Sequence, residues 1–231
     1  MRHAVRQPLG CKVWSSAAGR LELSEQDARL TLPRSTRLIK RIIDVCGSAL
    51  LLLFSSPVIL VFACLIKLED SGPVLYRRKV VGTSGVFDAF KLRSMRVDAD
   101  QILKEDAELR QQFQVNFKLK DDPRVTRVGA VMRRFSMDEL PQLWNVLRGE
   151  MSLVGPRMIS PAELEKFGEA AWIFNCVKPG LTGYWQLSGR HELGYEDRVT
   201  KELWYTQNRS LGLDLKILLK TPLRVLSGGE S

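Results

Sequence analysis

Two adjacent acids, Asp138 and Glu139, follow a pair of arginines in the segment RRFSMDELPQLWNVL, residues 133–147. An aspartate at the start of a helix can act as a nucleophile on phosphorus, as in enzymes that form an aspartyl-phosphate. Two adjacent carboxylates also suit Mg²⁺, which needs few protein ligands when phosphates supply the others. The same residues have a structural explanation, because Ser136 and Glu139 have the S-x-x-E spacing of a capping box. The residue pattern leaves both explanations open.

Several other segments offer groups that bind phosphate. Lys91 and Arg93 lie together in KLRSM, Arg157 ends the predicted tight turn VGPR, and Arg133 precedes the two acids. Ammonium and guanidinium groups match phosphate oxygens in charge and geometry. The glycine-rich stretch 178–183, KPGLTG, is expected to be a further phosphate loop. Each of these signals is weak alone, and together they predict a phosphoryl-transfer site around the Asp-Glu pair.

The chain lacks the motifs of several common site types. It contains no G-x-x-x-x-G-K-[ST] loop and no G-x-G-x-x-G, so neither a P-loop nor a Rossmann nucleotide site is indicated. Its four cysteines form no C-x-x-C pair and its two histidines no ligand cluster, which argues against a zinc site and a disulfide framework. The net charge of +9 fits nucleic acid, anionic lipid or a phosphorylated substrate. No nucleic-acid reader motif accompanies that charge.

A long apolar run is expected to position this chemistry. From Val45 to Ile66 the chain has 22 residues without a formal charge. A straight helix of this length would reach about 33 Å, enough to cross the core of a bilayer. Ser56 and Pro57 lie near its middle, and Pro57 has no N–H for the carbonyl of Leu53. We therefore expect a kink or break there, with serine hydroxyls satisfying the freed carbonyls.

Basic residues flank the apolar run on both sides, and positive residues mark the cytoplasmic side of a membrane. They are Arg34, Arg37, Lys40 and Arg41 before the run and Lys67, Arg77, Arg78 and Lys79 after it. A helix that spans the membrane would put one cluster outside, whereas a re-entrant hairpin bent at Ser56 and Pro57 keeps both inside. The re-entrant arrangement is the favoured prediction, with a straight span and a buried soluble helix as the alternatives.

The periodicities predict an α+β, mostly helical fold. Short strands are expected at 74–76 and 86–90 around a turn at 82–85, and helices at 98–117, 125–135, 163–174 and 197–207. Residues 211–226 predict either an amphipathic helix at a membrane surface, interrupted at Pro222, or a core-packed one. The expected domains are an N-terminal tail (1–33), a membrane-embedded re-entrant helix (34–70) and a compact cytoplasmic catalytic domain (71–226) with interfacial amphipathic helices.

These motifs, in this order, resemble those of the bacterial sugar transferases, the monotopic phosphoglycosyl transferases. The resemblance runs from about Arg37 to Thr221 and is most specific at 136–146, SMDELPQLWNV. Two positions depart from the family pattern. Met158 stands where a proline is usual after the Gly-Pro-Arg turn, and Glu202 stands where an aspartate is common, so Glu202 is not assigned to the site.

The resemblance implies a concrete reaction. Asp138 and Glu139 would be the catalytic dyad and Mg²⁺ ligands, with Asp138 attacking the sugar-bearing phosphate of a nucleotide sugar, by family expectation UDP. Polyprenyl phosphate would then accept the phosphosugar, in the first membrane step of exopolysaccharide, O-antigen or related glycan assembly at the bacterial inner membrane. Phosphate contacts fall to four cations, Lys91, Arg93, Arg133 and Arg157. The alternative is a non-enzymatic membrane-anchored scaffold; the sugar, the pathway and any homo-oligomer stay open.

Overall fold

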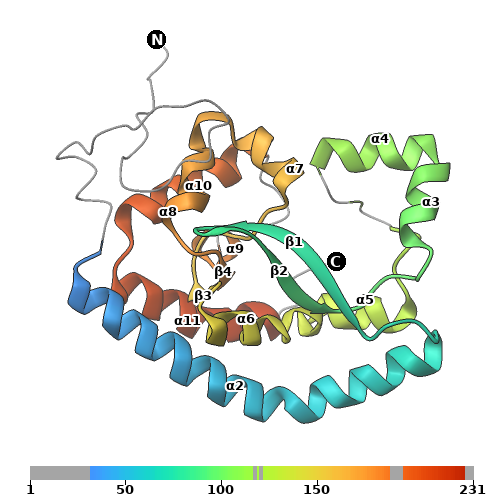
Figure 1. The fold of residues 1–231 in the computed structure, drawn as a ribbon, viewed down its shortest axis with the longest axis horizontal. Coiled ribbons are helices and arrows are strands. Elements are labelled where there is room, and N and C mark those ends of the chain that lie inside the picture. Colours follow the sequence, from blue (N-terminus) through green and yellow to red (C-terminus); the bar gives the residue numbers. More distant parts are fainter. Residues whose placement is uncertain (1–31, 117–118, 120–121, 188–194, 227–231) are drawn as a thin grey trace.

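The computed structural model describes residues 32–116, 119, 122–187 and 195–226. The fold is α+β and mostly helical, as the sequence predicts, with two small sheets. Figure 1 shows the long helix α2 running along one side of a body built from the sheets and shorter helices. The predicted tail lies outside the described residues except for Leu32 and Pro33. The expected division into domains stays a prediction.

Helix α2, Arg34–Glu69, is a single element of 36 residues that contains Pro57. The chain stays α-helical through the proline and bows gently around the body (Figure 1) instead of breaking. The Ser56 hydroxyl donates to the carbonyl of Leu53 at 2.7 Å. That carbonyl is the one the proline leaves without an N–H donor. The expected satisfaction of the freed carbonyl by a serine is therefore confirmed, whereas the expected break at Ser56 and Pro57 is wrong.

The predicted hairpin is confirmed and is longer than expected. Strands β1, Leu75–Gly82, and β2, Gly85–Leu92, pair antiparallel from Leu75↔Leu92 to Gly82↔Gly85. Gly85, directly after the connecting residues Thr83 and Ser84, has a φ of 110°, a conformation that favours glycine. Buried Val80 and Ala89 fasten the hairpin to the main core. The C-terminal end of β2 therefore places Lys91 toward the interior of the body.

The second sheet joins two segments far apart in sequence. Strand β3, Ser152–Val154, runs parallel to β4, Gly180–Thr182. The amide of Gly155 donates to Thr182 at 3.0 Å and that of Gly180 donates to Pro156 at 2.8 Å. The segment 178–183, expected to be a loop, contains strand β4, and the contact with Pro156 already uses the amide of Gly180. Its assignment to phosphate stays a prediction. The glycines serve close approach of the two backbones: a Cβ on Gly155 would lie 2.3 Å from the Lys178 carbonyl oxygen.

The helix predicted at 98–117 is two helices. They are α3, Ala99–Glu105, and α4, Ala107–Asn116, and Asp106 between them is extended. The Asp106 carboxylate accepts from the amide of Leu109 at 2.9 Å, so this side chain starts a new helix. The helices predicted at 125–135 and 197–207 are confirmed as α5 (Arg127–Arg134) and α10 (Tyr195–Asn208). The helix predicted at 163–174 is instead three short segments, α7 (Pro161–Leu164), the 3-10 helix η2 (Glu165–Trp172) and α8 (Ile173–Cys176). The short α9, Tyr184–Leu187, was not predicted.

Helix α11, Leu211–Leu226, has the predicted bounds and passes through Pro222 without interruption. One face is packed in the body, with Asp214 and Ile217 buried. The opposite face carries exposed leucines at 215, 219, 223 and 226. The helix thus combines both predicted alternatives, a core-packed face and an apolar face open to its surroundings.

The N-terminal half of α2 is bound tightly to the body. Asp44, 5 % exposed, accepts from the Ser152 hydroxyl at 3.0 Å and the Leu153 amide at 2.9 Å. Lys40 donates to Asp214 at 2.6 Å, joining α2 to α11. These buried contacts set the position of β3 relative to the long helix.

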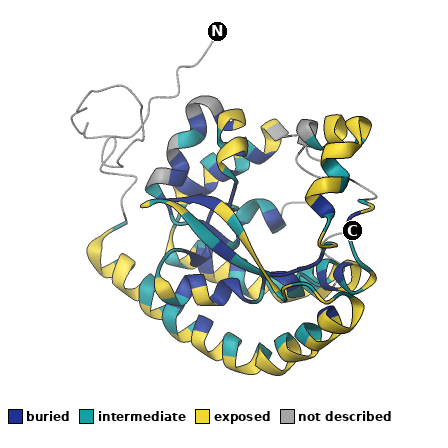
Figure 2. Ribbon diagram, turned by 45° about the vertical axis from the view of Figure 1, so that its right-hand side comes forward, coloured by how far each residue is buried: buried dark blue, intermediate teal, exposed yellow. Residues whose placement is uncertain are grey.

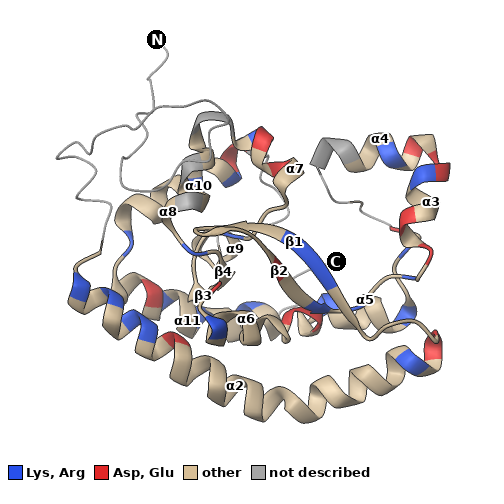
Figure 3. Ribbon diagram, in the orientation of Figure 1, with Lys and Arg blue, Asp and Glu red and all other residues tan. Residues whose placement is uncertain are grey.

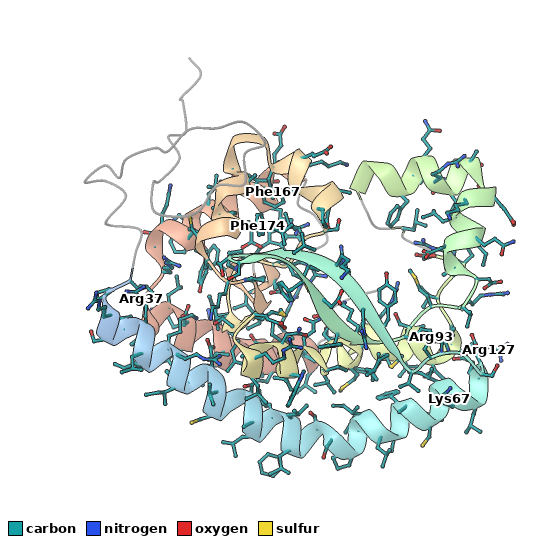
Figure 4. All side chains as sticks on the ribbon, viewed as in Figure 1. Arg37, Lys67, Arg93, Arg127, Phe167 and Phe174 are labelled. Atoms are coloured by element: carbon teal, nitrogen blue, oxygen red, sulfur yellow. The ribbon has the colours of Figure 1, made fainter. Side chains whose placement is uncertain are left out.

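The C-terminal end of α2 is bound to the same body. Arg93 forms an ion pair with Asp70 at 2.6 Å, and Glu69 accepts from the amide of Arg127 at 2.9 Å. Figure 4 shows Arg93 and Arg127 beside Lys67 at this end of the helix. Between the two attachments, the outward face of α2 is exposed (Figure 2) and uncharged (Figure 3). Its large exposed residues include Leu50, Leu51, Leu53, Phe54, Leu60, Val61 and Leu68.

Candidate active site

The Asp-Glu pair lies in a short 3-10 turn. This turn, η1, spans Met137–Glu139, and helix α6 follows at Gln142–Arg148. The predicted capping box is wrong: Ser136 adopts a left-handed conformation, φ 54° and ψ 25°, and makes no side-chain cap. The pattern predicted Asp138 in the first turn of an α-helix, but the residue lies in the 3-10 turn instead. A capping box does form elsewhere, between Ser160 and Glu163 at the start of α7.

The two acids meet cations from two other elements. Lys91, from the end of β2, donates to Glu139 Oε1 at 2.8 Å, and its Nζ lies 3.5 Å from Asp138 Oδ2. An Nη of Arg157, which follows β3, lies 3.9 Å from the same Glu139 oxygen. Asp138 and Glu139 are 5 % and 7 % exposed. The structure thus brings four of the six predicted site residues into one buried cluster of alternating charge.

The charge of Lys91 depends on this cluster. Burial by itself lowers the pKa of the lysine, but the carboxylates of Glu139 and Asp138 outweigh burial, so the pKa is raised above its ordinary 10.5. Lys91 is therefore an ammonium at any pH where the protein would work. It is suited to hold an acidic group in place and is not a general base.

Glu202, on α10, binds the backbone of Arg157 and so helps to position this residue. Its Oε1 accepts from the Arg157 amide at 2.9 Å, and its side chain is 0 % exposed. Burial raises the pKa of this carboxyl to about 7, against the opposing effects of the Arg157 amide and the Arg198 charge. Glu202 was not assigned to the site because it departs from the aspartate common in the family, and its contact with a backbone amide 45 residues away leaves no local pattern. The signal in the sequence that could have indicated Glu202 was its position as an acid within the predicted helix 197–207.

The remaining two predicted phosphate contacts are bound elsewhere in the described structure. The Arg93 guanidinium is 7 % exposed in its pair with Asp70, so it joins β2 to the end of α2. Arg133 donates from Nε to the Ser94 hydroxyl at 3.0 Å. Their assignment to phosphate stays a prediction, and the structure gives each a positioning contact instead.

Two carboxylates are a suitable donor set for Mg²⁺ when a phosphorylated substrate supplies further oxygens. Asp138 and Glu139 are adjacent, buried and hard oxygen donors. In the described part of the chain, no group of three or more His, Cys, Asp or Glu side chains could hold a metal by itself. The cluster fits a metal shared with substrate and does not fit a closed structural site.

The sequence pattern of the bacterial sugar transferases matches residues 35–228. The chain belongs to the bacterial sugar transferase family. The family match contains the whole buried cluster, α6, α11 and all of α2 except Arg34. It also agrees with the resemblance found in the motifs.

Three relatives show which known proteins the chain is similar to. An uncharacterized sugar transferase of Haemophilus influenzae is 43% identical over 198 residues, which cover 84% of this chain and 42% of the relative. Undecaprenyl-phosphate galactose phosphotransferase of Salmonella typhimurium is 42% identical over 198 residues, covering 84% and 41%. Exopolysaccharide production protein ExoY of Rhizobium meliloti is 43% identical over 197 residues, covering 83% and 87%. The chain thus matches about two fifths of the first two relatives and most of the third.

Proposed function

We propose that this chain transfers a sugar-1-phosphate from a UDP-sugar to polyprenyl phosphate at the cytoplasmic face of the bacterial inner membrane. The observation that carries the proposal is the buried cluster in which Lys91 and Arg157 face the Asp138–Glu139 pair. Such a cluster has both an acid that can attack phosphorus and cations that can hold a diphosphate. The names of two relatives support the reaction class, one an undecaprenyl-phosphate galactose phosphotransferase and one an exopolysaccharide production protein.

The reaction has two displacements at one phosphorus. In the first, a carboxylate oxygen of Asp138 attacks the sugar-bearing phosphorus, its bond to the oxygen shared with the other phosphate breaks, and UMP leaves with that oxygen. In the second, a phosphate oxygen of polyprenyl phosphate attacks the same phosphorus and the bond to Asp138 breaks. The carboxylate is regenerated, and the product is a polyprenyl diphosphate sugar.

The neighbours of Asp138 have distinct roles in this scheme. Lys91, between the two acids, holds the Asp138 carboxylate in position and offsets negative charge at the reacting phosphate. Arg157 offers a planar guanidinium suited to phosphate oxygens. Asp138 and Glu139 would also be the ligands of Mg²⁺, with the donor's phosphates completing its shell. When bound, the metal supplies positive charge that offsets the negative charge of the diphosphate.

The membrane arrangement follows from the two attachments of α2. Among the described residues, α2 is the one helix long and apolar enough to cross a membrane. Both of its ends, however, bind one folded body, through Asp44 at one end and Asp70 at the other. A helix that crossed the bilayer would need parts of this body on both sides. We therefore infer a re-entrant helix whose exposed apolar face enters the lipid, flanked by the exposed leucines of α11.

An assay of the purified protein tests the proposed function. The protein is incubated with Mg²⁺, polyprenyl phosphate and a panel of UDP-sugars, and UMP release is measured. At least one donor should release UMP, and Asp138→Asn should abolish release while the variant stays folded and membrane-bound. Asp100→Asn removes an exposed acid on α3 and is the matched control, with unchanged release expected. A scaffold would release no UMP with any donor, and full activity of Asp138→Asn would reject the nucleophile.

A further inference from the structure

Two cations from distant parts of the chain meet beside Gly149, the residue that ends α6. Gly149 adopts a left-handed conformation, φ 81°. The position that a Cβ on this glycine would take lies 3.4 Å from Nη2 of Arg41 and 3.5 Å from Nζ of Lys178. The two charged nitrogens therefore lie close to one common point, which the glycine leaves without a side chain.

The two cations differ in their contacts. Arg41, on α2, donates to the carbonyls of Val146 and Leu147 at 2.7 Å each, so it joins α2 to the C-terminal end of α6. Lys178, shortly before β4, makes no hydrogen bond or ion pair with any residue that the structure describes. Both cations are half-buried, so each remains accessible from outside. Lys178 is thus a half-buried charge that lacks a protein partner within the described part of the chain.

The charge of Lys178 is poorly balanced by its neighbours. Burial lowers the pKa of this ammonium, the charge of Arg41 lowers it further, and Asp44 opposes both effects. Asp44, however, already accepts from the Ser152 hydroxyl and the Leu153 amide. An anion close to a half-buried ammonium stabilises the charged form. Arg41 and Lys178 together therefore suit a negatively charged oxygen.

Exposed apolar side chains lie next to these cations. On α2, Leu38 is one turn before Arg41 and Ile42 follows it directly, and both are exposed. On α6, Trp144 is exposed, and tryptophan is enriched where a membrane meets water. Figure 3 shows lysines and arginines at the N-terminal end of α2 and an uncharged stretch along its middle. The two cations thus lie where the apolar face of α2 meets the charged part of the body.

We propose that Arg41 and Lys178 bind the phosphate of an anionic phospholipid whose acyl chains lie along the exposed apolar residues of α2. This rests on the membrane arrangement given under the proposed function. The phosphate would accept from both cations at the point that Gly149 leaves open. Charge selects an anionic headgroup, and the neighbouring apolar residues select a lipid over a free anion.

The bound lipid is distinct from the acceptor substrate. Gly149 comes 11 residues after Asp138, and most of the residues between them are helical. At about 1.5 Å per helical residue, a phosphate beside Gly149 is roughly 15 Å from the proposed nucleophile, too far to react. The phospholipid would instead hold α2, the end of α6 and the start of β4 at one depth in the membrane surface. Because α6 begins three residues after Glu139, this also sets the depth of the acid pair.

The first test measures lipid binding to the full chain in neutral detergent, without donor, acceptor or Mg²⁺. Dioctanoyl phosphatidylglycerol is the probe, with dioctanoyl phosphatidylcholine and inorganic phosphate for comparison. Phosphatidylglycerol should bind most tightly and raise the melting temperature, since a ligand of the folded state stabilises it. Equal binding of phosphatidylcholine would show an apolar surface that does not recognise charge, and equal binding of inorganic phosphate would show a simple anion site. Either result overturns the proposal.

The second test compares lysines at the two ends of the membrane helix. Lys178→Gln should weaken phosphatidylglycerol binding about tenfold, since a hydrogen bond to a charged group is lost. Lys178→Arg keeps the charge and should keep most of the affinity. Lys67→Gln removes the same charge from an exposed position at the far end of α2 and should leave the affinity unchanged. No effect of Lys178→Gln, or an equal effect of Lys67→Gln, would mean diffuse attraction to a basic surface and would overturn the proposal.

Gly149→Asn tests the point between the cations while both charges stay in place. Asparagine tolerates a left-handed conformation, and its Cβ would lie 3.4 Å from Arg41 and 3.5 Å from Lys178. The variant should weaken phosphatidylglycerol binding, and unchanged affinity would overturn the proposal. If melting curves show that the variant is unfolded, the comparison of Lys178→Gln with Lys67→Gln decides alone.

Two further outcomes separate this site from the proposed function. Farnesyl phosphate that bound more tightly than phosphatidylglycerol, and lost this affinity in Lys178→Gln, would assign the site to the acceptor and overturn the proposal. Binding of phosphatidylglycerol that depends on Lys178, in a protein that releases no UMP from any donor, would support the lipid site and reject the proposed function.

Discussion

The ammonium of Lys91 donates to Glu139 Oε1 at 2.8 Å and lies 3.5 Å from Asp138 Oδ2, so one lysine contacts both acids of the pair. The lysine comes from the hairpin and the acids from a turn 47 residues later in the chain. The reactive geometry therefore depends on how the hairpin packs on α6. Changes at Lys91 test that dependence.

Lys91→Met should reduce UMP release by about a hundredfold or more, since a fixed positive charge is lost at the reacting phosphate. It should also lower the free energy of unfolding by about 3 kcal/mol, because two buried carboxylates lose their shared cation. Release is therefore measured per folded protein, with the folded fraction taken from thermal melts. Lys79→Met, an exposed lysine of the same hairpin paired with Asp88, is the control and should change both quantities little. Equal effects of the two substitutions would show that Lys91 has no special role.

Gly155→Ala should disrupt the β3–β4 pair and with it the position of Arg157. Its Cβ would lie 2.3 Å from the Lys178 carbonyl oxygen and 2.8 Å from the Gly180 amide nitrogen, and both are backbone atoms that have little room to move. We expect a loss of several kcal/mol in stability, on the order of an overpacked core substitution or more. Gly212→Ala has nothing within 4 Å of the new Cβ and should be neutral or stabilise α11 by up to about 1 kcal/mol. Similar melting temperatures for the two variants would contradict the close approach of the two strands.

Glu202 makes stability depend on pH. Its pKa rises from 4.5 in the unfolded chain to about 7 in the folded protein. The folded state thus binds this proton more tightly, and its stability falls as pH rises through that window and is level above it. The loss amounts to about 3 kcal/mol, since each pH unit in the window is worth roughly 1.4 kcal/mol.

Glu202→Gln removes that dependence while keeping an acceptor for the Arg157 amide. Its melting temperature should match the wild type near pH 5 and exceed it at pH 8. Glu108→Gln, which changes an exposed acid of α4, should follow the wild type at both values. If the melting curves of Glu202→Gln and the wild type stay parallel from pH 5 to 8, the buried carboxyl does not titrate in this range.

The re-entrant arrangement predicts that both ends of α2 face the cytoplasm. One epitope tag is placed before Arg34 and another at the C-terminus, and each is exposed to protease in spheroplasts and in inverted vesicles. Both tags should be cut in inverted vesicles alone. Cleavage of either tag in spheroplasts would mean that the helix crosses the membrane.

Local patterns predicted those elements whose signals are contained in their own residues. Gly82 and Gly85 between alternating strands indicated the hairpin, and the spacing of leucines indicated α11 with its correct bounds. The Asp138–Glu139 pair was identified because its motif is contiguous. In each case the structure adds partners without changing the element.

Predictions failed where a distant partner decides the conformation. Ser136 and Glu139 have the spacing of a cap, but Glu139 pairs with Lys91, and Ser136 turns to a left-handed conformation instead. Residues 178–183 have the composition of a loop, yet residues 180–182 form strand β4, and Gly180 lies close to the backbone of Gly155. The phosphate assignment of Arg93 stays a prediction, but no local pattern indicated its pair with Asp70. Sequence spacing does not encode such choices, because they depend on how separate elements pack.

The most direct test of the account looks for the bond between the nucleophile and phosphorus. The protein is mixed with its true donor and no acceptor, quenched in acid, digested and examined by mass spectrometry. The account predicts a phosphosugar on the peptide that contains Asp138, which disappears when polyprenyl phosphate is added before quenching. Continued turnover with that peptide always unmodified would contradict it.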